Sequence, residues 1–439
     1  MSFPIARISR GAFLLAVMSL IALAVAYPAF AQTESVLYSF GASQTDGTVP
    51  SGPLVMDKSG NFYGVTWTGG TNGTGTVFEL SPSGTSWTET VLYNFGAAPD
   101  AQGPQAGLIM DSKGNLYGTS PFGGAHTNGQ GQPDPMGAVF ELTPTKKNGV
   151  TTWKESILYS FGTNSGDGMY PFGSLLMDKK GNLYGATQSD PKYYSGTIYK
   201  LTPTTLKKVT TWSETILHQF TDYEEPMGGL VADKAGDLYG TGSNGGANFD
   251  GELFELTPSG TLNVIYDFGN AFHDGKNPQT GLVMDSKGNL YGTTQFGGPY
   301  VGSGYGNNSG GTVYQLTPKG TLNYIYSFGG YTADGQAPLD SLVIDAKGNL
   351  YGTTWLGGTG PCTTTNAPSG CGTVFELKPT TKKGVTTWTE SILYNFDGPP
   401  TDGTFPSDGL TFVKTTGNFY GVTPTGGANN YGTIFELIP

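Results

Sequence analysis

The sequence predicts an all-β protein, a seven-bladed β-propeller built from four-stranded blades. Two observations lead to this prediction: a short segment recurs seven times along the chain, and similar apolar runs stand before and after each copy. A third observation is compositional, since glycine is abundant at 70 residues and charged residues make up only 13 %. Many short strands joined by glycine-rich turns have this composition, whereas a globular domain usually holds about 25 % charged residues.

The recurring segment is a tight turn followed by a strand. One copy reads DSKGNLYGTT from Asp285 to Thr294 and contains the pattern G-(N/D)-(L/F)-Y-G. Glycine supplies a positive φ, and the side chains of Asp and Asn bond back to the turn backbone. The segment therefore repeats because each blade needs one such hairpin. Its copies begin at Gly60, Gly114, Gly181, Gly236, Gly288, Gly348 and Gly417.

Each unit holds four β patterns, which we name A, B, C and D in chain order. A is an apolar run such as LVMD at Leu54, which we expect to be buried on both faces. B follows the turn, and C is a run such as TVFEL at Thr76; both alternate, as half-buried strands do. D is a run such as VLYNF at Val91. Seven units of four strands predict a propeller.

The ends of the chain predict how the ring closes. The first strand after the leader segment is a lone D pattern, SVLYSF from Ser35 to Phe40, and the last strand is a C pattern that ends at Pro439. The N-terminal strand is thus expected to complete the last blade and to leave no sheet edge open. A β-helix or linear solenoid is the alternative, but neither would need the missing strand.

Residues 1–31 are predicted to be a secretory signal peptide, and residues 32–439 to be the propeller. Arg7 and Arg10 precede an apolar run from Gly11 to Ala26, and Ala29-Phe30-Ala31 is a small-x-small cleavage site. An uncut membrane anchor is the alternative, although the run is short for a membrane span. We expect the cleaved protein to be secreted or periplasmic, monomeric and without a membrane span.

Charge restricts the partners of the cleaved chain. Arg7 and Arg10 are the only arginines, so the remaining charge is 20 lysines minus 34 acidic residues, or −14. Arginine is the usual side chain for bidentate contacts to phosphate. An acidic chain without arginine is therefore not expected to bind nucleic acid.

Cys362 and Cys371 are the only cysteines, and they lie nine positions apart. In an exported protein this spacing favours one local disulfide. A two-cysteine metal site is the alternative, but no histidine lies near them in the sequence.

The pattern GNLYGTTxxGG followed by GTVFEL resembles the GloVer tandem-repeat family of exported bacterial proteins, over essentially the whole chain after the leader. This resemblance implies a secreted repeat protein with no established activity. Family members carry varied C-terminal anchors, and this sequence shows none after Pro439, so we expect a protein that is released or held by something else.

One face of the predicted ring has the features of a binding surface. In a propeller the D–A and B–C connections lie on the same face, which we call the loop face. Here the B–C loops are long and unlike one another, and such loops on a regular scaffold usually carry function. Aromatic rings near carboxylates suit neutral glycans, although packing between blades is the alternative. The candidate ligand-binding residues are Trp67, Phe122, Tyr193, Tyr194, Phe249, Phe296 and Trp355.

The acidic residues are expected to gather on the loop face and the lysines on the opposite face. The motif Asp-Gly-x-x-Pro recurs where the chain enters a blade, and a turn that positions strand A is its expected role. A ring of these carboxylates could alternatively bind Ca²⁺, and no other cofactor is expected. The ring consists of Asp46, Asp167, Asp274, Asp334 and Asp402.

No catalytic motif stands out. The chain has three histidines, and we expect His126 and His273 to belong to distant blades. We therefore predict a non-catalytic binding or scaffold module that takes a neutral or cationic glycan, a peptide or a protein on its acidic loop face. A glycosidase or lyase that uses a pair of loop-face carboxylates is one alternative, and a structural component of the envelope is another.

Overall fold

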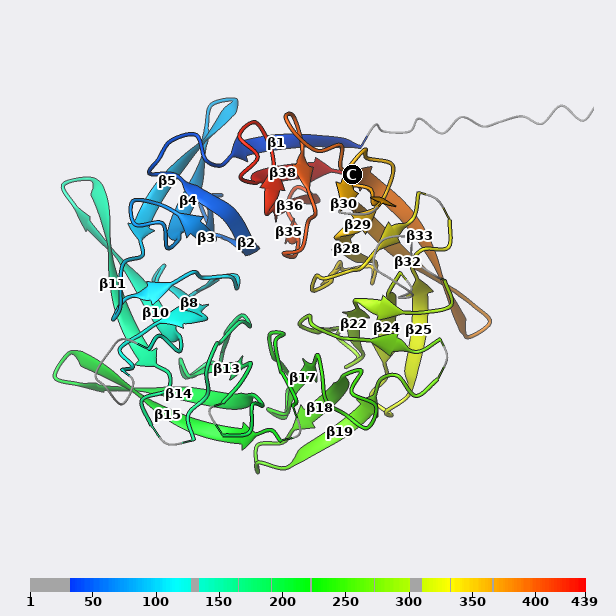
Figure 1. The fold of residues 1–439 in the computed structure, drawn as a ribbon, viewed down its shortest axis with the longest axis horizontal. Helices are drawn as coiled ribbons and strands as arrows, with labels where there is room; N and C mark the ends of the chain where they lie inside the picture. The colour runs from blue at the N-terminus through cyan, green and yellow to red at the C-terminus, as the bar shows by residue number, and fades with distance from the viewer. Residues whose placement is uncertain are drawn as a thin grey trace, which may run out of the picture. The chain divides into compact units, whose positions relative to one another are not determined.

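The computed structural model describes residues 32–439 apart from 128–133, 165, 191, 222, 272, 301–309, 332 and 365–366. These residues form strands and no helix. Seven four-stranded antiparallel sheets are arranged in a ring, so the fold is the predicted seven-bladed β-propeller (Figure 1). The predicted signal peptide, residues 1–31, lies outside the described residues. Nothing in the described part of the chain forms a helix long and apolar enough to cross a membrane.

Each blade contains strands A, B, C and D in that order across the sheet. Blade 1 consists of β2 (Gly47–Met56), β3 (Phe62–Gly69), β4 (Thr76–Ser83) and β5 (Ser86–Asn94). Blade 2 consists of β7 (Ile109–Met110), β8 (Leu116–Ser120), β10 (Ala138–Lys147) and β11 (Val150–Ser160). Blade 3 consists of β12 (Leu176–Met177), β13 (Leu183–Thr187), β14 (Thr197–Leu206) and β15 (Val209–Gln219). Blade 4 consists of β16 (Val231–Ala232), β17 (Leu238–Gly242), β18 (Glu252–Leu256) and β19 (Leu262–Asp267). Blade 5 consists of β21 (Val283–Met284), β22 (Leu290–Thr294), β24 (Thr312–Leu316) and β25 (Leu322–Ser327). Blade 6 consists of β27 (Val343–Ile344), β28 (Leu350–Thr354), β32 (Thr373–Lys382) and β33 (Val385–Asn395). Blade 7 consists of β35 (Thr411–Val413), β36 (Asn418–Thr423), β38 (Thr433–Ile438) and β1 (Thr33–Ser39).

The N-terminal strand closes the ring, as the sequence predicts. β1 runs antiparallel to β38, with Thr33 opposite Ile438 and Ser39 opposite Thr433. β1 lies at the outside of blade 7, beyond β38 and β36 (Figure 1). The first and last strands of the propeller therefore share one sheet, and blade 7 has the same four strands as the others.

The A–B turn has the predicted mechanics. Asp285 Oδ1 accepts hydrogen bonds from the backbone N–H groups of Lys287 and Asn289, at 2.8 and 2.9 Å. Asn289 Nδ2 donates to the other carboxylate oxygen at 2.7 Å. Gly288 has a φ of +83°, a conformation that an L side chain rarely adopts. The turn is thus held by its own side chains, which explains why this string repeats.

Strand A differs from the prediction. We expected it to be buried on both faces, but in blades 2 to 6 it has only two residues, and both are half-buried. The leucine that precedes it, such as Leu282, is buried. The physical reason is topological: A is an edge strand that pairs with B alone, so its other edge has no neighbour within the sheet.

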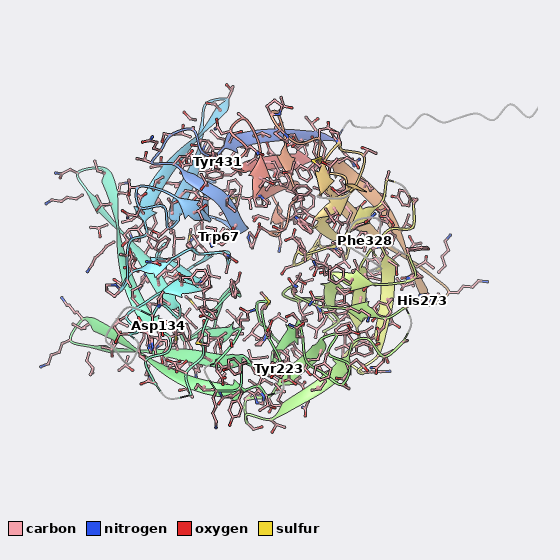
Figure 2. The ribbon with its side chains drawn as sticks, in the orientation of Figure 1. Trp67, Asp134, Tyr223, His273, Phe328 and Tyr431 are labelled. Carbon is pink, nitrogen blue, oxygen red and sulfur yellow. A yellow bond between two sulfur atoms is a disulfide. The ribbon has the colours of Figure 1, made fainter. Side chains whose placement is uncertain are left out.

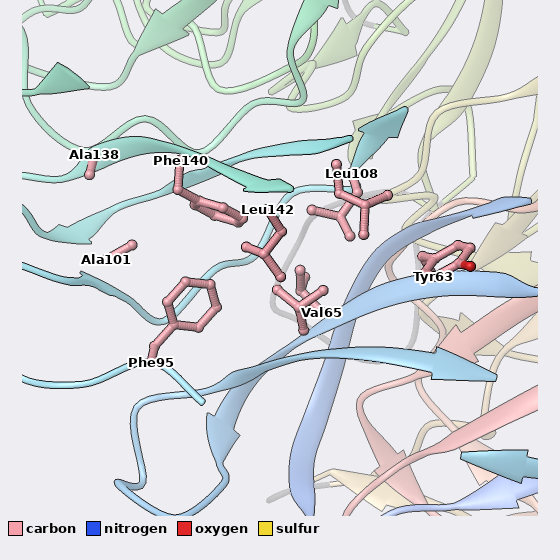
Figure 3. Close-up of a cluster of buried hydrophobic side chains, with 10 residues drawn as sticks. Tyr63, Val65, Phe95, Ala101, Leu108, Ala138, Phe140 and Leu142 are labelled. Atoms are coloured by element: carbon pink, nitrogen blue, oxygen red, sulfur yellow. The ribbon is translucent and has the colours of Figure 1, made fainter. Parts of the chain in front are cut away.

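The hydrophobic core lies between blades. Each of the seven buried clusters joins residues of two neighbouring blades. Figure 3 shows one of them, where Tyr63 and Val65 of blade 1 belong to the same cluster as Leu108, Phe140 and Leu142 of blade 2. A phenylalanine at the end of each strand D contacts a ring in strand C of the next blade, with centroids 5.0 to 5.3 Å apart. Packing between blades therefore fixes the ring, and with it the positions of the loops.

Candidate functional site on the loop face

Short ladders join the two kinds of loop on the loop face. Segments from D–A loops pair with segments from B–C loops, which the sequence did not reveal. The four paired segments are β6 (Ala101–Gln102) with β9 (Phe122–Gly123), β20 (Gly275–Lys276) with β23 (Phe296–Gly297), β26 (Gly335–Gln336) with β29 (Leu356–Gly357), and β34 (Gly403–Thr404) with β37 (Thr425–Gly426). A further ladder, β30 (Thr363–Thr364) with β31 (Ala367–Pro368), lies within the B–C loop of blade 6.

Glycine is required where these ladders begin. Gly297 has a φ of +96°, and a Cβ at this position would lie 2.1 Å from the backbone oxygen of Asp274. Any other residue would therefore have to push the D–A loop away from the B–C loop. The repeated Gly-Gly of the sequence marks this close approach of two loops.

The residue before the proline of Asp-Gly-x-x-Pro adopts a left-handed backbone in five blades. At Ala337, φ is +55°; its N–H donates to Gly310 of the preceding blade at 2.7 Å, and its carbonyl accepts from Trp355 at 3.0 Å. Such a conformation costs about 1–2 kcal/mol for an L residue, so the surrounding contacts must hold it. The five residues are Val49, Tyr170, Asn277, Ala337 and Phe405. The loop face is thus a fixed surface whose loops are locked from blade to blade.

The five aspartates of the predicted acidic ring do not form an open ring. All of them are buried, with at most 5 % of each residue exposed. Asp167, for example, accepts from the hydroxyl of Tyr159 at 3.0 Å and from the backbone N–H of Thr163 at 3.2 Å. This correction has a physical reason, because the turn folds each carboxylate inward onto strand D. The geometry fits the predicted turn role of Asp46, Asp167, Asp274, Asp334 and Asp402.

Of the other loop-face acids, Asp397 is exposed, and Asp100, Asp134, Glu224, Glu225, Asp250 and Asp408 are half-buried. Asp190 and Asp340 are buried, and Asp222 lies outside the described residues. Burial raises the pKa of Asp340 to about 7 and that of Asp408 to about 6. Among the described residues, the expected acidic character of the loop face is therefore partly internal, and half of its carboxyl groups remain at least partly accessible.

The predicted aromatic residues lie in different blades and differ in exposure. Tyr194 and Phe249 are 65 % and 68 % exposed, whereas Trp67, Phe122 and Tyr193 are close to 40 %. Phe296 and Trp355 are half-buried. Trp67 belongs to blade 1 and is labelled in Figure 2, whereas the other candidates belong to blades 2 to 6, so no single cluster gathers all the rings.

Two aromatic candidates pack against the neighbouring blade. Phe122 contacts Tyr170 with ring centroids 6.0 Å apart, and Trp355 contacts Phe405 at 5.9 Å. Trp67 lies over Gly103, where a Cβ would come within 3.0 Å of its indole ring. These rings therefore combine inter-blade packing with an accessible edge.

A hollow on the loop face lies between the loops of blades 6 and 7. Its volume is about 470 Å³. The Thr404 and Thr425 side chains on its wall are 2.6 Å apart, and the Asn430 side chain holds the adjacent loop through the N–H of Gly426. The lining residues include Cys362, Asp397, Thr404, Phe405, Thr425 and Asn430.

The predicted disulfide is present at this hollow. Cys362 and Cys371 are joined, with their Cα atoms 5.0 Å apart. Cys371 is fully buried, and its carbonyl accepts the N–H of Phe405 at 2.8 Å. The disulfide thus ties the B–C loop of blade 6 to the aromatic residue that lines the hollow.

A larger hollow lies on the opposite face, among the A–B turns. Its volume is about 760 Å³, and it is an open depression between blades 3, 4 and 5. Lysines and aspartates line it in similar numbers, and the aspartates are engaged in their own turns. Its ionisable residues are Asp178, Lys179, Lys180, Asp233, Lys234 and Asp285.

The sequence analysis missed a set of outer-strand glutamates. They recur four positions before the Tyr or His of strand D, in the pattern E-(S/T)-(I/V)-L-(Y/H), which was the available signal. They are Glu34, Glu89, Glu155, Glu214 and Glu390. It also missed Glu252, which is 1 % exposed where five other blades have threonine. Burial raises the pKa of Glu252 to about 8, and the carboxylates of Glu224 and Asp267 add to this effect.

The histidines do not form a pair. His126 Nε2 lies 3.7 Å from Asp134 Oδ2 in blade 2, whereas His273 lies in the loop that leads into blade 5. Within the described residues, no group of three or more His, Cys, Asp or Glu side chains could hold a metal ion.

Comparison with known proteins fits the repeat pattern. The profile of the Gloeobacter/Verrucomicrobia repeat matches residues 26–221 and 205–435. The chain belongs to this family. Among curated proteins, none matches this chain.

Two solved structures show partial similarity to this repeat protein. A Dyadobacter fermentans protein of unknown function is 15 % identical, with a TM-score of 0.41, and the match covers 82 % of this chain and 97 % of that one. A protein with a provisional gluconolactonase assignment is 14 % identical, with a TM-score of 0.34, over 68 % of this chain and 83 % of that one. Neither similarity is close enough to assign an activity.

Proposed function

We propose that this protein is an exported, non-catalytic binding module that takes a neutral glycan on its loop face. The observation that carries the proposal is the hollow between blades 6 and 7, where an aromatic ring stands beside hydroxyl and amide groups. Glycan recognition combines the face of an aromatic ring with hydrogen bonds to sugar hydroxyls. Phe405 would supply the ring, and Thr425 and Asn430 the polar groups, beside the exposed carboxylate of Asp397.

The rigidity of the surface supports this proposal. A rigid site loses little conformational entropy when a ligand binds. Phe405 is held by its left-handed backbone, by the ring of Trp355 and by the loop that carries the disulfide. Exposed rings elsewhere on the loop face, such as Trp67, would extend the surface along a polymeric glycan.

The predicted export of the protein also supports the proposal of glycan binding. The predicted signal peptide would deliver the protein to an oxidising compartment, where the Cys362–Cys371 disulfide persists. Polysaccharides are abundant outside the cytoplasm, and the acidic composition of residues 32–439, which contain no arginine, disfavours polyanionic ones.

Binding to soluble polysaccharides tests the proposal. Residues 32–439 would be run in native gels that contain a neutral, a cationic or an anionic polysaccharide, and the chain length of each polymer would be measured after incubation. We expect retardation by a neutral polymer without shortening. The Phe405→Ala variant should weaken binding about tenfold, equivalent to ~1.4 kcal/mol.

Leu206→Ala is the matched control, because Leu206 is exposed at the tip of the β14–β15 hairpin on the opposite face. It should bind like the wild type. Equal loss in both variants, or binding to no polysaccharide, would contradict the proposed site. Shortening of the polymer would contradict the non-catalytic role.

A further inference from the structure

Carboxyl pairs occur at five of the seven junctions between neighbouring blades. At each junction the aspartate of the loop that enters a blade lies near a glutamate on the outer strand of that blade, and a tyrosine of the preceding blade bonds the aspartate. The five sets are Tyr38–Asp46–Glu89, Tyr93–Asp100–Glu155, Tyr159–Asp167–Glu214, Tyr326–Asp334–Glu390 and Tyr394–Asp402–Glu34.

These pairs contain buried oxygens without a hydrogen-bond partner. In all five glutamates, Oε1 has neither solvent contact nor partner. The same holds for Oδ1 of Asp46 and Asp167, two residues that are at most 5 % exposed. A buried carboxylate without a partner is costly, and two adjacent ones cost more.

No lysine neutralises these pairs. The two ion pairs in the described part of the chain lie elsewhere, at His126–Asp134 and Lys276–Asp250. The ionisable groups that face each junction are its own Glu, Asp and Tyr, together with Tyr331 at Glu390 and Asp397 at Asp402. All of these are acids or phenols, so the missing positive charge has to come from a bound proton or cation.

The hydrogen-bond geometry at Tyr159 favours a bound proton over a bound cation. The Tyr159 hydroxyl lies 3.0 Å from Asp167 Oδ2 and 2.8 Å from Glu214 Oε2. A phenol has one hydrogen and can donate to only one of these oxygens. The other carboxyl must carry a hydrogen of its own and donate it to the hydroxyl oxygen or to its partner.

Blade 5 provides a natural comparison. No glutamate stands at this junction; instead, the hydroxyl of Tyr324 reaches Oδ1 of Asp274. A neutral O–H group thus occupies the place where five other blades have a carboxyl. In blade 4, Leu262 pairs with strand C as Glu89 does in blade 1, and His218 replaces the tyrosine of the preceding strand.

We propose that each of the five junctions holds one proton shared between its glutamate and its aspartate, so that the ring is more stable at acidic than at alkaline pH. The five protons are structural: each replaces a repulsion between two carboxylates with a hydrogen bond at the junction of two blades.

The pKa shifts agree with the geometry. Burial, followed by repulsion from the nearby aspartate, raises the pKa of Glu34 and Glu89 to about 8 and that of Glu155 to about 7. Burial likewise raises the pKa of Glu390 to about 7. The folded ring therefore holds more protons than the unfolded chain between about pH 4.5 and 8. This contribution to stability is complete below about pH 4.5 and is lost as the pH rises through 7 to 8.

Urea unfolding of residues 32–439 between pH 5 and 9, with EDTA present, tests the proposal. The unfolding midpoint should fall between pH 5 and about pH 8 and level off above it. Replacement of all five glutamates by glutamine keeps a donor and removes the charge, so this variant should lose most of the pH dependence and exceed the wild type at pH 9. An unchanged slope in the variant would overturn the proposal.

Glu376→Gln is the matched control, because Glu376 also accepts a bond from a tyrosine, Tyr351, but lies outside these junctions. It should keep the wild-type slope. Added Ca²⁺ at pH 9 should stabilise the wild type and the five-glutamine variant equally. Stabilisation of the wild type alone would overturn the proposal in favour of a cation between the carboxylates.

An infrared measurement on the wild type needs no variant to fold. Buried protonated carboxyl groups give a C=O band distinct from that of carboxylates. The band should be present at pH 6 and vanish towards pH 9. Its absence at pH 6 would overturn the proposal.

Discussion

At the scale of single residues, two buried tyrosines stand out. Tyr199 and Tyr314 are fully buried in strand C of blades 3 and 5, and neither hydroxyl has a hydrogen-bond partner. The other five blades have phenylalanine at this position. The hydroxyl of Tyr199 points at Gly185, where a Cβ would lie 2.4 Å from it. Each hydroxyl therefore costs desolvation free energy without a compensating bond.

Tyr199→Phe is predicted to stabilise the protein. The change removes an unsatisfied buried hydroxyl and keeps the ring that packs against Phe161. The expected gain in the free energy of unfolding is about 1 kcal/mol, measured by urea unfolding. Tyr314→Phe should give a gain of similar size.

Tyr159→Phe is the control for this prediction, because it removes a hydroxyl that bonds Asp167 and Glu214. It should destabilise the protein by about 1–2 kcal/mol. Equal destabilisation by Tyr199→Phe would show that the buried hydroxyl has a partner after all.

At the scale of elements, local sequence patterns predicted the strands and turns well, but contacts between loops could not be predicted from the sequence. The Asp285 turn and the lone strand from Ser35 to Phe40 could be identified because their signals lie within a few residues. The ladder of β20 with β23 could not, since it joins loops about 20 residues apart and has only two residues in each strand. The burial of Asp274 follows from this ladder, so the sequence showed an acidic loop where the fold has an internal carboxylate.

The candidate site was predicted only in part, because some of its residues have local sequence signals and others depend on contacts between loops. Trp67 and Trp355 were identified because aromatic residues in glycine-rich loops are conspicuous in a sequence. Phe405 was missed as a candidate, because its place in the hollow depends on a left-handed backbone and on the loops of blades 6 and 7. Such a hollow is formed by loops of two neighbouring blades that are far apart in the sequence.

Deletion of residues 32–40 is predicted to open the ring. The change removes β1 and the fully buried Phe40, and it leaves β38 as an unpaired edge. The loss should be several kcal/mol, at about 2 kcal/mol for each buried apolar side chain. Thermal melting and gel filtration would measure it, and the open edge should promote self-association.

Deletion of residues 206–209 is the matched control, since it shortens the exposed tip of the β14–β15 hairpin and leaves every sheet with four strands. It should melt close to the wild type and stay monomeric. A deletion of β1 with wild-type stability would contradict closure by the N-terminal strand.

At the scale of the whole molecule, the acidic residues fall into two groups, one buried between the blades and one on the surface. Much of the negative charge lies inside the junctions between blades, where we propose that protons neutralise it. The surface that remains on the loop face presents aromatic edges, the Thr425 hydroxyl, the Asn430 amide and the exposed carboxylate of Asp397. This division favours a neutral ligand on the loop face and a ring whose stability depends on pH.

Hydrogen exchange of residues 32–439 with and without neutral polysaccharides tests the central claim most directly, because it locates the bound ligand. We predict slower exchange in residues 397–405 and 425–431, which line the hollow between blades 6 and 7, and unchanged exchange in the β14–β15 hairpin. Slower exchange confined to the opposite face, or no change with any polysaccharide, would contradict the claim that the loop face is a glycan-binding surface.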